Sequence, residues 1–407
     1  MPSPGRFISL KNPKPLPPLS HLFSSPSPSL SSPPSSASPS PSSLSPPPLK
    51  SIVDDLFQEA NLQALVQKFK SSSQCHRFRS KHRIYSVTVR RLASANLHDS
   101  IADILNHQKQ FPEISTEGFA VRLISLYGQS HMFDHARNLF DELPQLNCPR
   151  TVKSFNALLT AALNSKLFHK VTELFDTLPP EISVKPDVFS YNILIQAFCK
   201  MGSFGSAVSV LDMMEMNGVK PDLVTFNSLL NGFYTGSQFS DAEKIWTKME
   251  EYNCVPNIIS YNERLRGLVL EGKTEEAVKL VGELGSRGLK PSIFSFNSLI
   301  KGYCNDGNLE EAKRIFSELV NNDCVPNRWT FEILIPRVCE KGDLNWAVKV
   351  CKEGMHRRRS VDVGVIQVVV DALVRESRVE DAKKLVEFGV STGYAAWSGL
   401  KLPSGDE

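Results

Sequence analysis

The side chains best suited to chemistry in this chain are its eight cysteines and nine histidines, and neither set has the spacing that chemistry needs. No two cysteines have the C-x-x-C spacing of metal and redox sites, and no histidine stands with a serine or cysteine in a catalytic arrangement. We therefore expect no disulfide framework, metal, cofactor or enzymatic activity. Six cysteines instead recur at two places of a repeat, which favours burial as small apolar side chains: Cys199, Cys304 and Cys339 at one place, Cys148, Cys254 and Cys324 at the other.

The chain is organised by a motif that returns at a fixed step of 35 residues. The stretch from Pro186 to Ile195 is followed by similar stretches that begin at Pro221, Pro256, Pro291 and Pro326. A fixed period of this length predicts a repeat array. Aligned on the motif, the units begin at His82, Glu117, Val152, Val188, Leu223, Ile258, Ile293, Arg328 and Val363.

Each unit has the apolar pattern of two helices. In the unit that begins at Val188, the first helical pattern is interrupted at Gly202, where glycine accepts the left-handed backbone that closes a helix. The second pattern carries Ala207 on its apolar face, and Pro221 prevents this helix from continuing. Alanine holds the place of Ala207 in most units, so two antiparallel helices can approach closely. One pair cannot bury its apolar face alone, so we predict an all-α fold, a right-handed superhelical solenoid of antiparallel helix pairs.

Composition divides the chain into four parts. Residues 1–50 are rich in serine and proline without any acidic residue, which is typical of a cleaved organelle transit peptide; a disordered linker is the alternative. Residues 51–81 are expected to form an incomplete helical pair that caps the array, 82–397 the repeats, and 398–407 a short tail. No apolar run reaches the ~18 residues that a membrane-spanning helix needs, so we expect no membrane partner.

Charge is distributed unevenly along the chain. The net charge of +3 is too small to identify a nucleic-acid-binding protein. However, no acidic residue lies between Glu59 and Asp99, a segment that holds several lysines and arginines. Two interpretations stay open: a patch that faces phosphates, or the solvated end of a basic protein.

The repeated motifs resemble those of the pentatricopeptide repeat proteins, specifically the plain P-type built only of 35-residue units. The resemblance extends from His82 to about Trp397 and implies an organelle protein that binds single-stranded RNA at about one base per repeat. The tetratricopeptide alternative has a different period and signature. The motifs that carry the resemblance are Ser190–Ile195, Thr225–Leu230, Ser260–Asn262 and Ser295–Ile300, with the closers Lys185-Pro186-Asp187, Lys220-Pro221-Asp222, Val255-Pro256-Asn257, Lys290-Pro291-Ser292 and Val325-Pro326-Asn327.

The resemblance implies that the fifth and last residues of a unit contact the base edge, and that the second residue packs against the base planes. By the family pattern these residue pairs favour pyrimidines. An asparagine paired with aspartate favours U, and an asparagine paired with asparagine or serine favours C. An amide offers both a donor and an acceptor, which suits this role. The predicted base-reading pairs are Asn156 with Asp187, Asn192 with Asp222, Asn227 with Asn257, Asn262 with Ser292, and Asn297 with Asn327. The predicted base-packing residues are Phe189, Val224, Ile259 and Phe294, with Trp329 as a further candidate.

Helix capping is the competing explanation for these asparagines, because an asparagine at a helix start satisfies free backbone amides without any ligand. Serine or threonine precedes the asparagine by two residues, as Ser190 precedes Asn192, and is the better cap. We therefore expect the helix to begin at Ser190, which leaves Asn192 in the first turn and favours RNA contact.

The remaining units depart from this pattern. They pair Ser86 with Thr116, Val121 with Thr151, Glu332 with Asp362, and Gln367 with Trp397. A valine cannot bind a base edge, and two carboxylates would repel phosphate. With five reading units, affinity is expected to depend on phosphate contacts, for which the candidates are Lys185, Lys220, Lys290, Arg77, Arg79, Arg83, Arg90, Arg91, Arg357, Arg358 and Arg359.

Three hypotheses for function follow. The first is an adaptor that binds a pyrimidine-rich single strand of an organelle transcript in RNA metabolism or translation. The second is a structural component of the small subunit of the mitochondrial ribosome that binds ribosomal RNA, because the short plain array is similar to mitoribosome-associated members of the family. The third is a protein-binding solenoid. The resemblance favours the mitochondrion, whereas the serine- and proline-rich start favours the chloroplast.

Overall fold

A computed structural model describes residues 49–358, 361–394, 397 and 399–402, and all regular structure in these ranges is helical. None of the helices in these ranges is long and apolar enough to cross a membrane. The chain divides into two compact units, Met1–Ile84 and Tyr85–Glu407, which are described separately. The predicted transit peptide lies almost entirely outside the described residues and stays a prediction.

The first unit consists of short helices around a small apolar core. The core is formed by side chains such as Leu56, Phe69 and Phe78, and the rings of Phe69 and Phe78 meet edge to face with centroids 5.2 Å apart. Its first helix begins at Leu49, so the boundary predicted between residues 50 and 51 falls inside a helix. The elements are α1 (Leu49–Gln58), α2 (Leu62–Ser72), α3 (His76–Arg79) and the start of α4 (His82–Ser94).

The second unit is a series of helix pairs. Each first helix begins at the residue at which the repeat predicts a unit. The first helices are α4, α6 (Glu117–Gln129), α8 (Val152–Asn164), α10 (Val188–Lys200), α12 (Leu223–Thr235), α14 (Ile258–Leu270), α16 (Ile293–Asn305), α18 (Arg328–Glu340) and α20 (Val363–Arg375). The second helices are α5 (His98–Asn106), α7 (Phe133–Glu142), α9 (Phe168–Glu181), α11 (Phe204–Met216), α13 (Phe239–Glu251), α15 (Thr274–Leu284), α17 (Leu309–Asn321), α19 (Leu344–Arg358) and α21 (Val379–Ser391). The 3-10 turns are η1 (His107–Gln110), η2 (Pro112–Ser115) and η3 (Gly285–Arg287).

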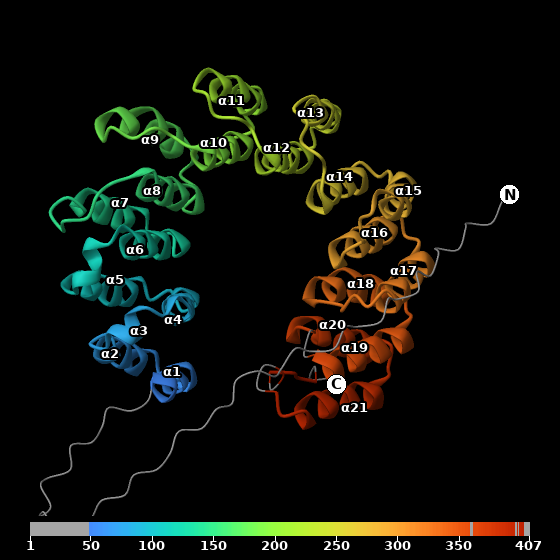
Figure 1. The fold of residues 1–407 in the computed structure, drawn as a ribbon. Coiled ribbons are helices and arrows are strands. Elements are labelled where there is room, and N and C mark those ends of the chain that lie inside the picture. The colour runs from blue at the N-terminus through green and yellow to red at the C-terminus, as the bar shows by residue number, and fades with distance from the viewer. Residues whose placement is uncertain (1–48, 359–360, 395–396, 398, 403–407) are drawn as a thin grey trace, which may run out of the picture. The chain divides into compact units, whose positions relative to one another are not determined.

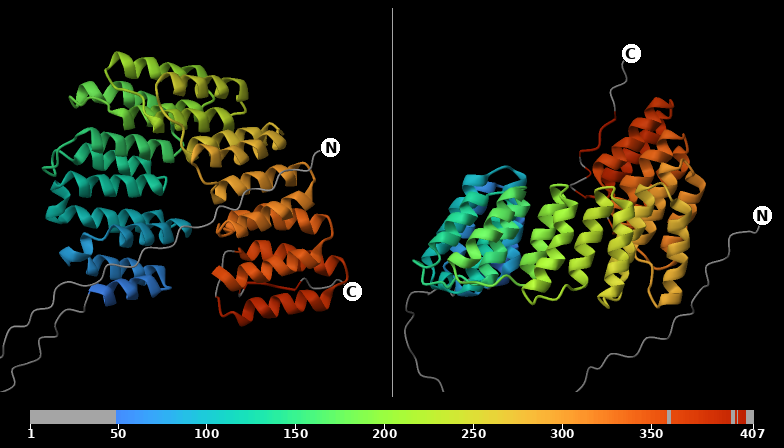
Figure 2. Two further views of the ribbon diagram at one scale, coloured as in Figure 1. Left: turned by 45° about the vertical axis from the view of Figure 1, so that its right-hand side comes forward. Right: turned by 90° about the horizontal axis from the view of Figure 1, so that it is seen from above.

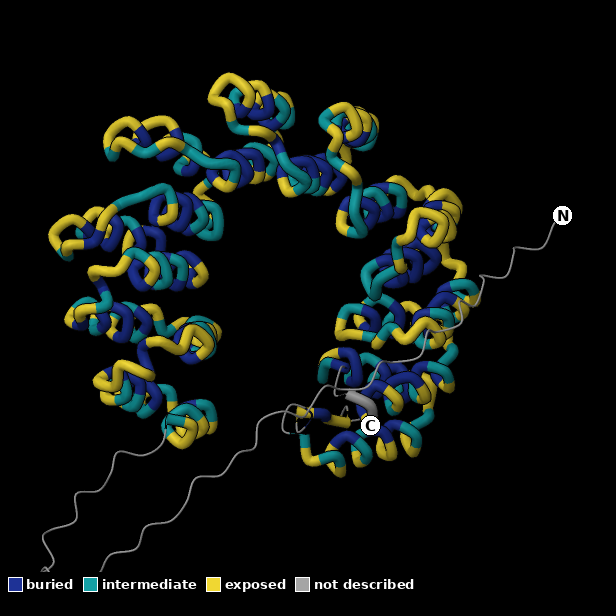
Figure 3. Tube along the Cα trace, in the orientation of Figure 1, coloured by how far each residue is buried: buried dark blue, intermediate teal, exposed yellow. Residues whose placement is uncertain are grey.

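Within this second unit the helices form two layers (Figure 1). From α6 onward, each first helix packs against the first helix of the next pair and against its own second helix. Buried residues lie on the sides of the helices that face one another (Figure 3), and the helices of successive pairs run side by side in the further views (Figure 2). The predicted all-α solenoid of antiparallel helix pairs is confirmed.

A column of small residues allows the close packing of the two layers. The predicted alanines are fully buried, and in six of the seven units the larger residue one turn further on is buried as well, as at Trp246 and Phe316. Both aromatic rings are therefore core, as expected from their place in the repeat. The alanines are Ala136, Ala207, Ala242, Ala277, Ala312, Ala347 and Ala382.

The join between units is a helix cap. Helix α10 begins at Val188, so the expected start at Ser190 is wrong. The cap is Asp187, whose carboxylate accepts from the Ser190 amide at 3.0 Å, while the Ser190 hydroxyl accepts from the Asp187 amide at 3.1 Å. The same reciprocal arrangement, a capping box, begins α8, α12, α14, α16 and α18. The last residue of each of these units therefore caps the next unit's first helix.

The cap of α8 includes a carboxylate from the preceding unit. Glu117 Oε1 accepts hydrogen bonds from the Thr151 amide (3.0 Å), the Thr151 hydroxyl (2.7 Å) and the Ser154 amide (3.3 Å). Burial acts to raise the pKa of Glu117, but these hydrogen bonds outweigh it and hold the pKa below its usual value. The ionised carboxylate therefore ties two units together.

The stabilisation by Glu117 should depend on pH. A carboxylate whose pKa is lowered by folding stabilises the folded protein at pH values above its unfolded-state pKa, which is about 4.3 for glutamate. This stabilisation is lost as the pH falls through the folded-state pKa. Glu117→Gln should therefore reduce the free energy of unfolding by about 1 kcal/mol at pH 7, and the difference from wild type should shrink in acid. Urea denaturation followed by circular dichroism at several pH values measures this. Glu181→Gln, at an exposed site, is the control. A loss of stability in Glu117→Gln that is the same at every pH would contradict a stabilising role for the ionised Glu117 carboxylate.

Candidate nucleic-acid interface

The predicted base-reading asparagines lie in the first turn or two of the first helices, beside the capping residues of the next unit. Three of the five predicted pairs are joined by a hydrogen bond between their side chains. These bonds run from Asn156 Nδ2 to Asp187 Oδ1 (2.9 Å), from Asn262 Nδ2 to Ser292 Oγ (3.4 Å) and from Asn297 Nδ2 to Asn327 Oδ1 (3.2 Å). The structure thus brings these residues, which are 30 or 31 positions apart, into contact.

The five asparagines differ in accessibility. Asn156, Asn192, Asn262 and Asn297 are buried, Asn297 completely, whereas Asn227 is half-exposed. Asn227 is therefore the most accessible of the five asparagines. The residue that caps the next unit's first helix holds three of these amides, those of Asn156, Asn262 and Asn297.

The predicted base-packing residues are exposed although they are apolar. Phe189 and Val224 have 54% of their surface exposed and Ile259 has 52%. Phe294 is half-buried, because its ring meets that of Trp329 with centroids 5.6 Å apart and the Arg266 guanidinium lies 5.1 Å from its centre. Large apolar side chains exposed in a regular row mark an interaction surface more strongly than isolated ones do.

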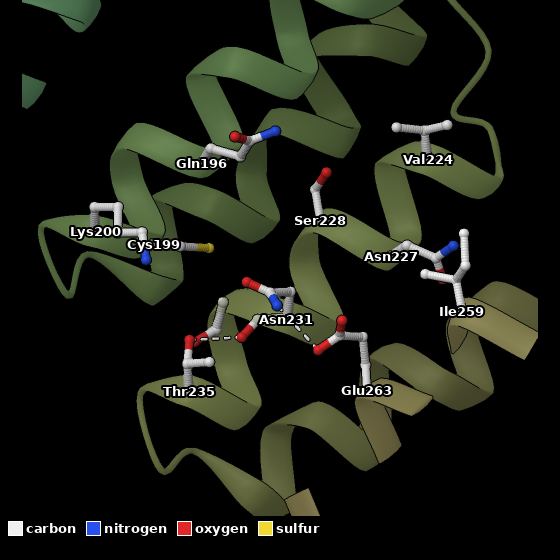
Figure 4. A pocket seen from close by; sticks show the side chains of 11 residues that line it. Gln196, Cys199, Lys200, Val224, Asn227, Ser228, Asn231, Thr235, Ile259 and Glu263 are labelled. Atoms are coloured by element: carbon white, nitrogen blue, oxygen red, sulfur yellow. Dashed lines mark hydrogen bonds between the residues drawn. The ribbon is translucent and has the colours of Figure 1, made fainter. Parts of the chain in front are cut away.

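A cleft of about 340 Å³ opens on this surface across α12. Val224 and Ile259 line it together with the half-exposed Asn227, and side chains of α10 and α14 form its walls (Figure 4). The cleft therefore brings together one predicted base-reading residue, Asn227, and two predicted base-packing residues, Val224 and Ile259.

The wall of this cleft holds a carboxylate that sequence reasoning missed. Glu263 has only 9% of its surface exposed, accepts a hydrogen bond from Asn231 at 2.9 Å and pairs with Arg266 at 2.9 Å. Burial raises the pKa of Glu263, and Arg266 and the Asn231 hydrogen bond partly oppose this shift. Serine holds the corresponding place at Ser228 and Ser298, so a comparison of the units at this place could have revealed the charge.

The predicted phosphate contacts fall into several groups. Lys185, Lys220 and Lys290 are exposed in the loops that enter the first helices, each two residues before a capping residue. In the first unit, Arg77 and Arg83 are exposed, and Arg83 also lies over the Phe57 ring at 5.9 Å. In the second unit, Arg90 is exposed and Arg91 is half-buried. The side chains of Arg357, Arg358 and Arg359 lie outside the described part of the structure, so these three stay predictions.

Arg79 is a correction. Its side chain is 7% exposed, and its Nη1 donates to the carbonyl oxygens of Ser73 at 2.7 Å and Gln74 at 3.2 Å. A guanidinium used by the backbone in this way closes a turn of the first unit and does not face solvent. We therefore withdraw Arg79 from the predicted phosphate contacts.

Two carboxylates near the end of the array are neutralised within the chain. Arg328 donates to Glu332 at 2.6 Å and lies 3.2 Å from Asp362. Sequence reasoning expected these carboxylates to repel phosphate, but one arginine bridges both. Each of these two carboxylates therefore has a positive partner within the chain.

The last unit is covered by the segment that follows it. Trp397 is 1% exposed and its indole donates to the Val361 carbonyl at 3.0 Å. The Gln367 amide donates to the Lys401 carbonyl at 2.8 Å and accepts from the Lys401 amide at 3.1 Å. Gln367 and Trp397, the weak pair of the last unit, are therefore occupied by contacts within the chain.

Burial differs among the cysteines that recur in the repeat: Cys148 and Cys304 are buried as predicted, whereas Cys199, Cys254, Cys324 and Cys339 are half-buried. Burial raises the pKa of Cys199 to about 12 and those of Cys304 and Cys339 to about 11, so these thiols stay protonated at neutral pH. Within the described ranges, no cluster of three or more His, Cys, Asp or Glu side chains could hold a metal ion.

Comparison with known families gives matches along the array. The PPR repeat family matches residues 186–235, 221–269, 256–305 and 291–340. The pentatricopeptide repeat domain matches residues 138–201, and the PPR repeat matches residues 122–148. Together these matches extend from residue 122 to residue 340 without a gap.

Similar curated proteins come from Arabidopsis thaliana. The small ribosomal subunit protein mS78 is 45% identical over 172 residues, which is 42% of this chain and 43% of that protein. The small ribosomal subunit protein mS79 is 43% identical over 172 residues, 42% of this chain and 44% of that protein. A mitochondrial pentatricopeptide repeat-containing protein is 42% identical over 134 residues, 33% of this chain and 32% of that protein. The chain thus matches less than half the length of these relatives.

Among solved structures, the pentatricopeptide repeat protein PPR10 from maize aligns with a TM-score of 0.44 and 18% identity, over 84% of this chain and 53% of that chain. A PPR10 structure in complex with an 18-nucleotide psaJ RNA element also has a TM-score of 0.44 and 18% identity, over 85% of this chain and 56% of that chain.

Proposed function

Because the chain belongs to the pentatricopeptide repeat family, we propose that it binds single-stranded RNA through its first helices, with one base at each reading unit. The observation that carries this proposal is the row of exposed apolar side chains, Phe189, Val224 and Ile259, each three residues before an asparagine amide. Solvent-exposed apolar groups gain from stacking on base planes, and amides beside them can bind base edges.

The five reading units define a short pyrimidine sequence. The units of Asn156 and Asn192 pair with aspartate and favour U, whereas those of Asn227, Asn262 and Asn297 pair with asparagine or serine and favour C. The proposed target therefore contains two U and three C in this order along the array. The chain acts as a non-catalytic adaptor.

Binding requires local rearrangement at one of the reading units. The cleft at Asn227 is open, so the first base enters there. At the unit of Asn297 the Phe294 and Trp329 rings meet with centroids 5.6 Å apart, so a base that stacks between these two packing residues must separate them. Base–aromatic stacking, which is worth about 1–3 kcal/mol per base, then replaces the packing of the two rings on each other.

An alanine substitution tests the base contact. Asn227→Ala in the full chain should weaken binding to a UUCCC-containing RNA about tenfold, because it removes the accessible amide and leaves the base edge unpaired. Fluorescence anisotropy at fixed salt measures the dissociation constant. Asn321→Ala, at an exposed asparagine at the end of α17, is the matched control and should change nothing. Equal affinities for Asn227→Ala and wild type would contradict the base contact.

A structural role in the mitochondrial ribosome is the second candidate, and the identity of 45% with mS78 and 43% with mS79 favours it. Both roles place the chain in mitochondria and both use RNA contact. Sedimentation of a mitochondrial lysate distinguishes them. Migration with the small ribosomal subunit after a high-salt wash supports the ribosomal role, whereas a light, RNase-sensitive complex supports the transcript adaptor.

A further inference from the structure

The reading asparagines are held differently according to the third residue of the next first helix. Where that residue is serine, its hydroxyl donates to the asparagine carbonyl oxygen of the preceding unit. This bond occurs in three places: from Ser190 to Asn156 (2.6 Å), from Ser260 to Asn227 (2.7 Å) and from Ser295 to Asn262 (2.9 Å). All five asparagines obey one rule, because the two units followed by threonine lack the bond.

Threonine directs its hydroxyl to its own cap. Thr225 Oγ1 donates to Asp222 Oδ1 at 2.9 Å, and Thr330 Oγ1 donates to Asn327 Oδ1 at 3.1 Å. The Oδ1 atoms of Asn192 and Asn297 are left buried without a hydrogen-bond partner. Both threonines are fully buried, and their β-branched side chains have few χ1 rotamers, which favours the orientation that places the hydroxyl on its own cap.

Two units with the same reading pair make the contrast sharp. Asn227 with Asn257 and Asn297 with Asn327 are both Asn/Asn pairs. Ser260 donates to the Oδ1 of Asn227, which fixes this amide and uses one of the two lone pairs of its oxygen. Asn297 Oδ1 has no partner, so this amide can also accept a hydrogen bond. The two units therefore differ in how their reading amides are held despite identical pairs.

We propose that, in the units whose reading pair is Asn/Asn or Asn/Ser, the serine or threonine at the third position of the following first helix is a positioning residue that sets base preference by fixing the reading amide. In the units paired with aspartate, such as that of Asn156 with Asp187, the carboxylate is itself an acceptor for the N3–H of uracil. This inference rests on the proposed RNA binding.

A serine-held amide has an oxygen that already accepts one hydrogen bond, so its NH₂ donors are favoured for base contact, which suits the N3 and O2 acceptors of cytosine more than the N3–H of uracil. Where threonine follows, the Oδ1 atom of the reading asparagine can accept a hydrogen bond from uracil N3–H. This bond is favourable because a buried acceptor without a partner is costly. The unit of Asn297 therefore tolerates U better than the unit of Asn227 does.

The experiment measures discrimination at single nucleotides. RNAs in which each position of UUCCC is changed in turn between C and U are titrated against the full chain at fixed salt. The nucleotide whose discrimination disappears in Asn227→Ala faces the unit of Asn227. Ser260→Thr should reduce the C-over-U preference at that nucleotide about fivefold, the effect of one neutral hydrogen bond. Thr330→Ser should raise the C-over-U preference about fivefold at the nucleotide facing Asn297.

The reciprocal variants separate positioning from stability. Thr330→Ser removes only a methyl group, so it keeps the test valid if Ser260→Thr folds poorly. A structural role alone would change affinity for C and U equally. Unchanged ratios in both variants, with binding and the Asn227→Ala effect intact, would overturn this inference and leave the proposed function standing. Absence of RNA binding by the wild type would instead reject the proposed function.

Discussion

Replacing Lys185, Lys220 and Lys290 together with alanine should weaken binding to pyrimidine-rich single-stranded RNA about 100-fold at 0.1 M salt. Each lysine is exposed in a loop that enters a first helix, two residues before the cap beside a reading amide. Each phosphate contact to a single strand contributes about 0.7 to the slope of log affinity against log salt, so three contribute about 2. Over the tenfold salt difference between 0.1 M and about 1 M, this slope corresponds to about two decades of affinity.

The measurement is a salt titration of the dissociation constant for wild type and variant. The matched control replaces Lys279, Lys349 and Lys384, which are exposed on second helices, and removes the same charge from the other layer. The control should keep nearly all of the affinity. If the two triple variants lose affinity equally, net charge and not position determines binding, and the lysines of the loops are not phosphate contacts.

Gly267→Val should destabilise the array by about 3 kcal/mol, because the site has no room for a side chain. A Cβ atom at Gly267 would lie 2.1 Å from Cδ1 of Tyr234, whose ring is buried and whose hydroxyl donates to Glu243 at 2.6 Å. The ring cannot move aside without breaking that hydrogen bond. Urea denaturation followed by circular dichroism should show a lower midpoint.

The control for this substitution is a glycine in a helix with free space. A Cβ atom at Gly205 in α11 meets nothing within 4 Å. Gly205→Ala should therefore stabilise the protein by about 0.5–1 kcal/mol through helix propensity. A wild-type midpoint for Gly267→Val would mean that α12 and α14 are not closely packed at this glycine.

The positions of the helices were predictable from the sequence because one period controls them. Val188, Leu223 and the other unit starts are the first residues of first helices, and the buried alanines follow from their fixed place in each unit. The exposed packing residues, such as Phe189, were also predictable, because an apolar residue recurs at the second position of the units that begin at Val188, Leu223, Ile258, Ile293 and Arg328.

The hydrogen bonds and ion pairs at the joins between units were less predictable, because they depend on side-chain rotamers and on residues of the neighbouring units. Sequence reasoning placed the cap at Ser190 instead of Asp187, since both residue types cap helices well. It also missed that Arg328 bridges two carboxylates and that left-handed backbone closes a helix at non-glycine residues such as Lys166 and Ser237. Side chains that serve the fold in this way leave no periodic signal.

Crosslinking tests the central claim that RNA lies along the first-helix layer most directly. The full chain is bound to UUCCC-containing RNA, irradiated and digested, and the crosslinked peptides are identified by mass spectrometry. We expect crosslinks in the first turns of α10, α12, α14 and α16, including the peptides that contain Phe189 and Phe294. Crosslinks confined to second helices or to the basic segment around Arg77 would contradict this claim.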